Sequence, residues 1–227
     1  MLTLAGLAFF IVLGTWQVRR GHEKQQLFAA FDRVAGQPAM PLDQARRVVR
    51  DGSYEHVRVS GRFDPAHSWL LDNQMRGGRV GVMVFAPFEP LDGSTPLLVN
   101  RGFLARDPRG APLAVPPPSP GQQTLDALYA PAPGTGLRLG GNALPGQQGW
   151  PKTTIYLDIG EIAADLGRSL DPRVLLLTPA AGSPFVREWR PPVFPPERHF
   201  GYAFTWYSFA ALTLVLFAIL HRRRQRP

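Results

Sequence analysis

Four residues near the C-terminus carry the clearest chemical signal in the chain. His199, Tyr202, Ala203 and Trp206 are spaced i, i+3, i+4 and i+7, so they share one face of any helix that begins by His199. Neutral imidazole is the commonest protein metal ligand, and an ionisable side chain at the mouth of a membrane span points to function. The alternative is an aromatic belt, because Trp and Tyr favour the headgroup level of any span. Residue types alone leave both interpretations open.

The element that must position these residues is a C-terminal membrane helix. Residues 200–220 are 21 residues without a formal charge, rich in Phe, Leu and Ala. As a helix they would be about 31 Å long, which matches the hydrocarbon thickness of a bilayer. The run His221-Arg-Arg-Arg-Gln-Arg follows directly. The sequence therefore predicts a transmembrane helix over 199–220 and a basic cytoplasmic tail over 221–227.

A second membrane helix is predicted at the N-terminus, over residues 1–20. Residues 1–18 carry no charge, and the segment closes with Trp16-Gln17-Val18-Arg19-Arg20. A cleaved signal peptide is the alternative, but the segment lacks a basic start and a small-x-small cleavage site, which favours an uncleaved span. Two spans place both termini on one side, and the C-terminal arginines indicate that this side is cytoplasmic. Residues 16–20 and 199–206 would then emerge together on the outer face, where they could share a site.

Residues 21–198 predict a periplasmic domain rich in β-structure. The helix-friendly segment 21–32 is expected to continue the first helix, with short helices at 42–49 and at 161–166, the latter introduced by Asp158 in a capping-box-like arrangement. Proline- and glycine-rich loops are expected at 112–120 and 131–151. Apolar or alternating runs separated by turn signals predict strands at 57–63, 69–71, 80–88, 97–99, 124–129, 153–157 and 174–178. The predicted fold class is a membrane protein with two transmembrane helices flanking an extracytoplasmic, mostly antiparallel β (α+β) domain, either a sheet or a small barrel.

Composition excludes several classes of function. The chain has no cysteine, which excludes disulfides, thiolate metal sites and a cysteine nucleophile. Its net charge of +8 suggests a nucleic-acid partner until the charges are located. Six arginines flank the predicted spans, and removing them leaves 19 basic against 17 acidic residues. The basic character therefore belongs mainly to the membrane boundaries, and we expect no nucleic-acid partner.

The sequence contains no convincing catalytic motif. There is no nucleophile elbow, no phosphate-binding glycine loop, and no His-x-x-x-His pair for zinc; Gly77-Gly78 and Gly140-Gly141 are expected to form turns. The remaining histidines of the predicted domain are isolated, which favours structural roles. Arg101 follows an apolar strand and could pair with a buried carboxylate or an anionic ligand, with a structural role favoured. We therefore expect a protein that is not an enzyme.

Three blocks in order along the chain carry a family resemblance. They are Leu13-Gly-Thr-Trp-Gln-Val-Arg-Arg with Lys24; Val57-x-Val-x-Gly61-x-Phe63 followed by Gly81, Pro87 and Val99-Asn-Arg-Gly-Phe103; and His199-x-x-Tyr202-Ala203-x-x-Trp206-Tyr207. With a predicted span at each end, the chain resembles the surfeit locus protein one family, membrane factors for the assembly of cytochrome c oxidase. It departs from the family at Glu23, where Trp is common, and at Glu197, where Asn is frequent.

The resemblance implies a biogenesis factor that binds haem a and aids its insertion into oxidase subunit I. His199 would be the iron ligand, Tyr202, Trp206 and Trp16 would shelter the macrocycle together with Gln17, and Arg20, with Arg19 beside it, would pair with the propionates. The implied partners are subunit I, other assembly factors, haem a synthase and the lipid bilayer. The implied location is a bacterial inner membrane. The alternatives are an assembly scaffold that never binds haem and, with no motif behind it, a membrane-anchored periplasmic enzyme.

Overall fold

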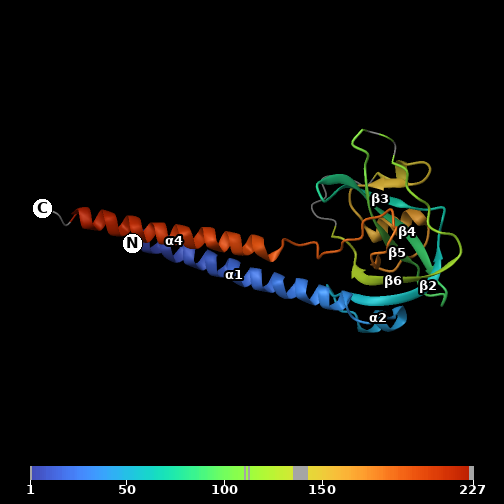
Figure 1. Ribbon diagram of the computed structural model, residues 1–227, viewed down its shortest axis with the longest axis horizontal. Helices are drawn as coiled ribbons and strands as arrows, with labels where there is room; N and C mark the ends of the chain where they lie inside the picture. Colours follow the sequence, from blue (N-terminus) through green and yellow to red (C-terminus); the bar gives the residue numbers. More distant parts are fainter. Residues whose placement is uncertain (1, 110, 112, 135–142, 225–227) are drawn as a thin grey trace. The chain divides into compact units, whose positions relative to one another are not determined.

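The computed structural model describes residues 2–109, 111, 113–134 and 143–224. The chain forms two compact units (Figure 1). One comprises Met1–Arg33 and Arg190–Pro227 and is helical; the other is Val34–Trp189 and contains the β-strands.

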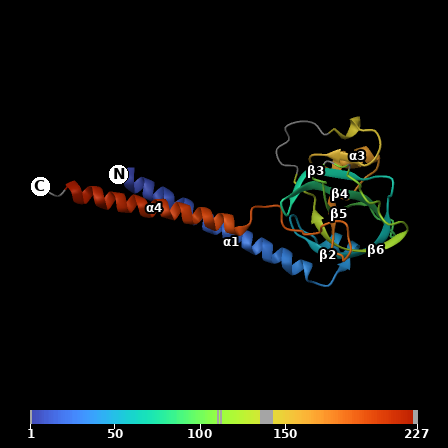
Figure 2. The ribbon, with the colours of Figure 1, turned by 45° about the horizontal axis from the view of Figure 1, so that its top comes forward.

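The helical unit consists of two long helices, α1 (Leu2–Ala35) and α4 (Pro196–Arg224). The helices lie side by side and run antiparallel, so that the start of α1 and the end of α4 lie at the same end of the pair (Figures 1 and 2). Helix α1 continues through 21–32, as predicted. Helix α4 begins three residues before the predicted start, because Pro196 has the φ angle that suits a first helical turn, and it extends into the basic tail.

One helix of the described chain could span a membrane by its length and composition. It is the segment Pro196–Arg222, which is 27 residues long and apolar, with few of its residues buried. The described residues contain no second helix that meets the same standard. The predicted C-terminal span over 199–220 therefore has structural support, whereas the N-terminal span over 1–20 stays a prediction.

The β-domain is a closed, mostly antiparallel barrel, one of the two architectures expected. Its strands are β1 (Met40–Pro41), β2 (Glu55–Phe63), β3 (Trp69–Arg76), β4 (Arg79–Pro90), β5 (Leu97–Ala105), β6 (Gln122–Pro131), β7 (Lys152–Thr154) and β8 (Arg173–Leu177). They follow the order β1-β2-β6-β8-β5-β4-β3-β7, and an additional β2–β4 pairing closes the ring (Figure 2). The pairs β1–β2, β3–β7 and β5–β8 are parallel and the others antiparallel.

Closure of the barrel depends on a glycine where two strands come close together. Gly61 of β2 pairs with Pro90 of β4, and a Cβ added at Gly61 would lie 2.2 Å from the Glu89 carbonyl oxygen. No side chain fits there, because real Cβ contacts do not become that short. Strand β4 pairs with β3 through residues 79–85 and with β2 through residues 88–90. Between β4 and β5 the register shifts by one residue, which leaves Arg101 of β5 as the extra residue of a β-bulge.

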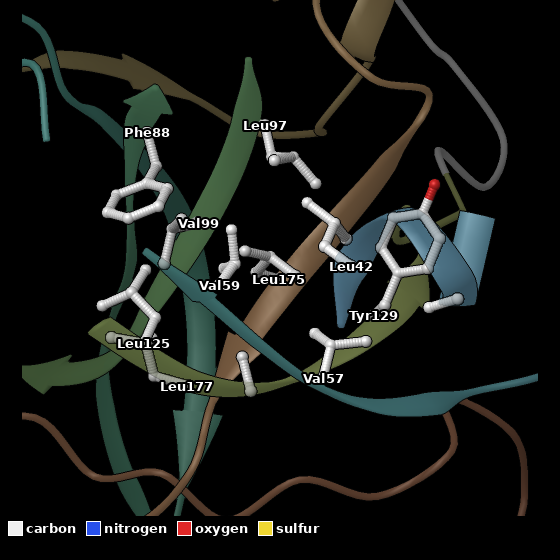
Figure 3. Packing of buried hydrophobic residues seen from close by; sticks show 12 residues of the cluster. Leu42, Val57, Val59, Phe88, Leu97, Val99, Leu125, Tyr129, Leu175 and Leu177 are labelled. Carbon is white, nitrogen blue, oxygen red and sulfur yellow. The ribbon is translucent and has the colours of Figure 1, made fainter. Parts of the chain in front are cut away.

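The barrel interior is filled by alternate residues of its strands (Figure 3). Val57 and Val59 of β2 are buried and the residue between them is exposed, which is the period-two pattern that predicted this strand. The short helix α2 (Leu42–Val48) adds Leu42 and Ala45 to the same cluster. A second cluster forms around Trp69 and Phe85 and includes Ile162 of α3 (Ile159–Leu166).

The other locally predicted elements are present, although some begin or end at other residues than predicted. The Asp158 side chain caps α3 by accepting a hydrogen bond from the Glu161 backbone N–H at 3.1 Å. Strand β7 ends at Thr154 rather than at 157, because the chain turns there and the Thr154 hydroxyl donates to the Tyr156 carbonyl oxygen. Gly77-Gly78 forms the β3–β4 turn with positive φ at both positions. The loop predicted at 131–151 contains a 3-10 turn, η1 (Leu144–Gly146), while Gly140-Gly141 lies outside the described residues.

Candidate functional site

His199 faces the opposite helix of the helical unit. Its Nδ1 lies 2.8 Å from Oε1 of Gln17, a residue 182 positions earlier in the chain. The imidazole is half-buried, one turn into α4. The helix pair thus brings together two of the residues that the sequence singled out at opposite ends of the chain.

The contact with Gln17 selects between the two neutral tautomers of the ring. An amide oxygen can only accept a hydrogen bond, so the tautomer that satisfies this contact has its proton on Nδ1. In the neutral ring, Nε2 is then the nitrogen with a free lone pair. This atom is buried and hydrogen-bonds to none of the described residues. A metal-bound histidine is held in the same way, with one nitrogen on an oxygen acceptor and the other free for the metal.

Close packing between α1 and α4 sets the register of this contact. A Cβ added at Gly14 would lie 2.7 Å from the Tyr207 ring, and one added at Gly21 would lie 2.6 Å from the Phe200 ring. Both glycines are buried, and their seven-residue spacing repeats about every two helical turns. The Thr15 hydroxyl also lies 3.1 Å from the Tyr207 hydroxyl. Sequence reasoning did not identify this interface, although the spacing of the two glycines was a signal for it.

Trp206 belongs to an aromatic cluster between the helices. It stacks on Phe10 of α1 with ring centroids 6.0 Å apart and planes inclined by 22°. Phe9 and Phe209 pack against the same ring edge to face, at 6.3 and 6.0 Å. Trp206 is therefore already held by protein side chains, one turn of α4 beyond Ala203, which is buried in the same face.

The other predicted site residues lie at the surface. Trp16 is 51% exposed and Tyr202 is 56% exposed, so neither packs into the helix contact. Arg20 pairs with Glu23 at 2.6 Å, and both side chains are largely exposed. Glu23 is the residue that departs from the family pattern, and it neutralises the guanidinium predicted to bind a propionate. The structure therefore joins His199 to Gln17 and places the other residues around this pair without joining them.

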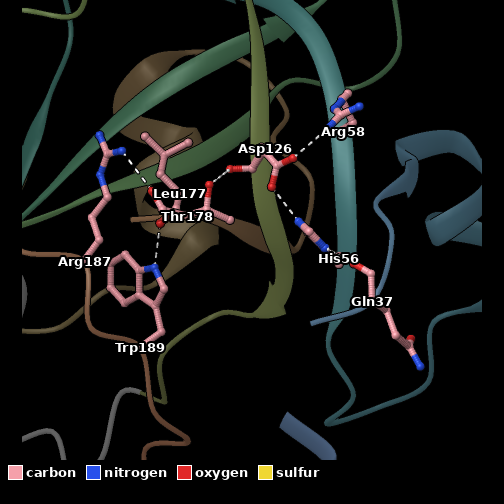
Figure 4. Close-up of polar contacts among 8 residues, drawn as sticks. All are labelled: Gln37, His56, Arg58, Asp126, Leu177, Thr178, Arg187 and Trp189. Carbon is pink, nitrogen blue, oxygen red and sulfur yellow. Dashed lines mark hydrogen bonds and ion pairs between the residues drawn. The ribbon is translucent and has the colours of Figure 1, made fainter. Parts of the chain in front are cut away.

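The isolated histidines of the β-domain have structural partners. His56 lies with Nδ1 2.5 Å from the Gln37 carbonyl oxygen and Nε2 2.5 Å from the Asp126 carboxylate (Figure 4). Asp126 also accepts from Arg58 at 3.0 Å. Burial raises the pKa of Asp126, but hydrogen bonds from His56 and Arg58 outweigh it, so the net shift is downward. This network links β2, β6 and the segment before β1, and it needs no ligand.

A second buried network surrounds Asp171. The Tyr129 hydroxyl donates to the Asp171 carboxylate at 2.9 Å, and Arg46 of α2 donates to the same group at 2.9 Å. Burial, together with the neighbouring Asp171 charge, raises the pKa of Tyr129 to about 12. Because Arg46 pairs with the buried Asp171 carboxylate, this cluster holds α2 on the barrel. The described residues contain no group of three or more His, Asp or Glu side chains that could hold a bare metal ion.

Comparison with known proteins identifies the chain. The family model described as "SURF1 family" matches residues 4–211, a range that contains nearly all of α1, the whole barrel and the first part of α4. The chain belongs to the SURF1 family.

Relatives of this SURF1-family chain differ in how much of their length is matched. A "SURF1-like protein" of Monosiga brevicollis is 28% identical over 93% of this chain and 83% of its own length. Human "Surfeit locus protein 1" is 33% identical over 41% of this chain and 36% of its own length. "Cytochrome oxidase assembly protein SHY1" of Saccharomyces cerevisiae is 29% identical over 42% of this chain and 25% of its own length.

Proposed function

We propose that this protein is a cytochrome oxidase biogenesis factor that binds haem a through His199 and aids its insertion into oxidase subunit I. The observation that supports the proposal most is the state of the imidazole, with Nδ1 held by Gln17 and Nε2 buried but hydrogen-bonded to none of the described residues. A buried nitrogen without a hydrogen bond destabilises a fold by about 1–3 kcal/mol. Coordination to iron would remove that penalty.

The donor set fits a haem better than a bare ion. A single imidazole supplies one ligand, and the described residues contain no cluster of three or more His, Asp or Glu side chains around it. A porphyrin supplies nitrogen ligands of its own, so one histidine would be sufficient to attach the group, which would supply the iron when bound. Haem a is the form implied by the family resemblance.

The neighbouring side chains would orient and cover the cofactor. Gln17 holds the ring, and the exposed indole of Trp16 and phenol of Tyr202 are available to lie against a flat, apolar macrocycle. Arg20 would pair with a propionate, which must replace Glu23; an exposed ion pair of this kind is worth only about 0–1 kcal/mol. Because Nε2 has almost no exposed surface, the side chains around it must move apart before a ligand binds.

The role in oxidase assembly rests on the relatives. The yeast relative is named as a cytochrome oxidase assembly protein, and the family model covers most of this chain. We infer an assembly factor rather than an enzyme, acting in a bacterial inner membrane with both termini cytoplasmic and the barrel periplasmic. Its partners would be subunit I, other assembly factors and haem a synthase. The apolar helix α4 and its basic end support membrane attachment.

The test of haem binding is the absorption spectrum of the purified protein after co-expression with the enzymes that make haem a. The proposal predicts a haem a band that co-purifies in stoichiometric amount. Protein that is purified without haem a under these conditions, although the cells contain it, contradicts the proposal.

The second candidate function is an assembly scaffold that holds oxidase subunits without haem. The burial of Nε2 favours it, because a purely structural histidine between two helices would also be covered. In cells depleted of haem a, the scaffold predicts undiminished co-purification of oxidase subunits with this protein. The haem-binding proposal predicts that the association with subunit I falls when haem a is depleted.

A further inference from the structure

Two arginines of the β-domain lie close together, and neither forms an ion pair with an acidic side chain of the described residues. Arg101 on β5 is 93% buried, since only 7% of its surface is exposed, and Arg187 lies half-buried on the segment that follows β8. The described residues place no carboxylate within 4.0 Å of either guanidinium. Buried arginines are normally paired with carboxylates, because removing an unpaired charge from water is costly. This pair therefore needs an explanation.

Each guanidinium is held by backbone carbonyl groups. Arg101 donates to the carbonyl oxygens of Pro116 and Pro117 at 2.7 and 3.0 Å. Arg187 donates from Nε to the Arg101 carbonyl oxygen at 2.9 Å. It also donates from Nη1 to the Thr178 carbonyl oxygen at 3.0 Å (Figure 4). These contacts with described residues use two of the five N–H groups on each arginine. The contacts hold both planar guanidinium groups in place and leave further N–H donors that a bound acceptor could use.

The pKa values of both arginines are lowered, as expected for guanidinium groups that lie in a partly buried place without a carboxylate among the described residues. Burial, and secondarily the charge of Arg187, lowers the pKa of Arg101 to about 10. Burial also lowers the pKa of Arg187. Asp126 lies on the wall of the same region, but its carboxylate is directed to His56 and Arg58 (Figure 4). The protein therefore leaves two positive charges close together that an added anion would stabilise.

Both arginines line open cavities. One cavity of about 260 Å³ is bounded by Arg101, Arg187, Ser119 and Thr178, and a neighbouring one of about 400 Å³ by the two arginines, Ser119 and the turn at 180–185. A water molecule occupies about 30 Å³ in the liquid, so each cavity can admit a small oxyanion with some of its water. Arginine forks match the oxygen geometry of phosphate and carboxylate groups.

We propose that Arg101 and Arg187 form a binding site for an oxyanion of the size and charge of phosphate. This site lies wholly in the barrel domain and does not depend on the haem site. The sequence alone could suggest Arg101 as a candidate for a carboxylate or an anion; it did not identify Arg187, which the fold brings to it across 86 residues.

The test is a calorimetric titration of inorganic phosphate into the full-length protein in detergent micelles at low ionic strength. We expect saturable one-to-one binding that Arg187→Gln weakens by at least about tenfold, the effect of losing one charge-assisted hydrogen bond. Arg187→Lys should also weaken phosphate binding, because an ammonium group keeps the positive charge but lacks the planar pair of N–H donors of a guanidinium group. The matched control is Arg79→Gln, an exposed arginine at the start of β4 that lines neither cavity, which should leave phosphate binding unchanged.

Thermal unfolding in phosphate-free buffer shows whether each variant is folded. If Arg187→Gln does not fold, the comparison of the wild type with Arg187→Lys decides the test. Phosphate should raise the unfolding temperature of the wild type and not that of Arg187→Gln. Glycerol 3-phosphate identifies the source of the anion: tighter binding than phosphate assigns the site to a lipid headgroup, and equal or weaker binding assigns it to the free ion. Absence of saturable binding to the wild type, or equal binding by wild type and folded Arg187→Lys and Arg187→Gln, overturns the proposal.

Discussion

The register of the two long helices can be tested with a single methyl group. Gly14 and Gly21 of α1 each face an aromatic ring of α4, and an added Cβ would lie 2.7 Å from Tyr207 or 2.6 Å from Phe200. Gly6 of the same helix has no atom within 4 Å of such a Cβ, so Gly6→Ala is a matched control. We predict that Gly14→Ala and Gly21→Ala destabilise the helix pair relative to Gly6→Ala.

The expected magnitude follows from two effects. Replacing Gly by Ala inside a helix stabilises it by about 1 kcal/mol, and this gain is common to all three positions. Forcing a methyl group into a packed contact costs about 1–3 kcal/mol, and this term applies only at Gly14 and Gly21. Each of these two variants should therefore unfold with a free energy about 1–3 kcal/mol below that of Gly6→Ala.

The measurement is the unfolding of the helical unit in mixed micelles titrated with SDS, followed by far-ultraviolet circular dichroism. Combining Gly21→Ala with Phe200→Ala removes the ring that the methyl group meets, so the penalty at Gly21 should disappear in the double variant. If Gly21→Ala and Gly14→Ala are as stable as Gly6→Ala, the helices do not pack in this register, and the contact between His199 and Gln17 loses its structural basis.

Three further predictions concern single side chains. Gln17→Leu should lower haem a affinity by about 10–100-fold while His199 remains, because the imidazole loses the acceptor that orients it; titration of haem a into the purified variant measures this. Asp126→Asn should lower the unfolding free energy of the barrel above about pH 4. Since the pKa of Asp126 is lowered in the fold, the difference from wild type should vanish as pH falls through that pKa in acid-denaturation curves; a pH-independent difference contradicts the ion-pair account. Tyr129→Phe should cost about 1–3 kcal/mol in urea unfolding below pH 10, because Asp171 stays buried without that donor. The folded-state pKa of Tyr129 is raised to about 12, so this contribution should be lost as pH rises from 10 through 12, and a cost that persists above pH 12 would refute the assignment.

Local patterns in the sequence predicted most of the barrel, because strands and caps are determined by near neighbours. The alternation at Val57 and Val59 gave β2, and Asp158 with Glu161 gave the start of α3. The β2–β4 pairing that closes the barrel could not be predicted in this way, because it depends on the absence of a side chain at Gly61 opposite a partner 29 residues away.

In the candidate site, too, local spacing predicted some features, whereas others depend on residues far apart in the sequence. The spacing of His199, Ala203 and Trp206 correctly places them on one face of α4, where Ala203 is buried against its surroundings. Tyr202 lies about 100° around the helix from Ala203 and is exposed. The spacing that placed Tyr202 on the same broad face as Ala203 therefore did not mean that Tyr202 packs against α1. The pairing of His199 with Gln17 requires the register between two helices, which side chains 182 residues apart determine and no local pattern reveals.

The most direct measurement of the central claim is the haem a content of His199→Ala, purified from cells that make haem a. The matched control is His221→Ala, a histidine of the same helix that lies beside Phe217 at the basic end. The account predicts that the haem a spectrum is lost in His199→Ala and retained in both the wild type and His221→Ala. An undiminished haem a spectrum in purified, folded His199→Ala would show that Nε2 of this residue is not the iron ligand.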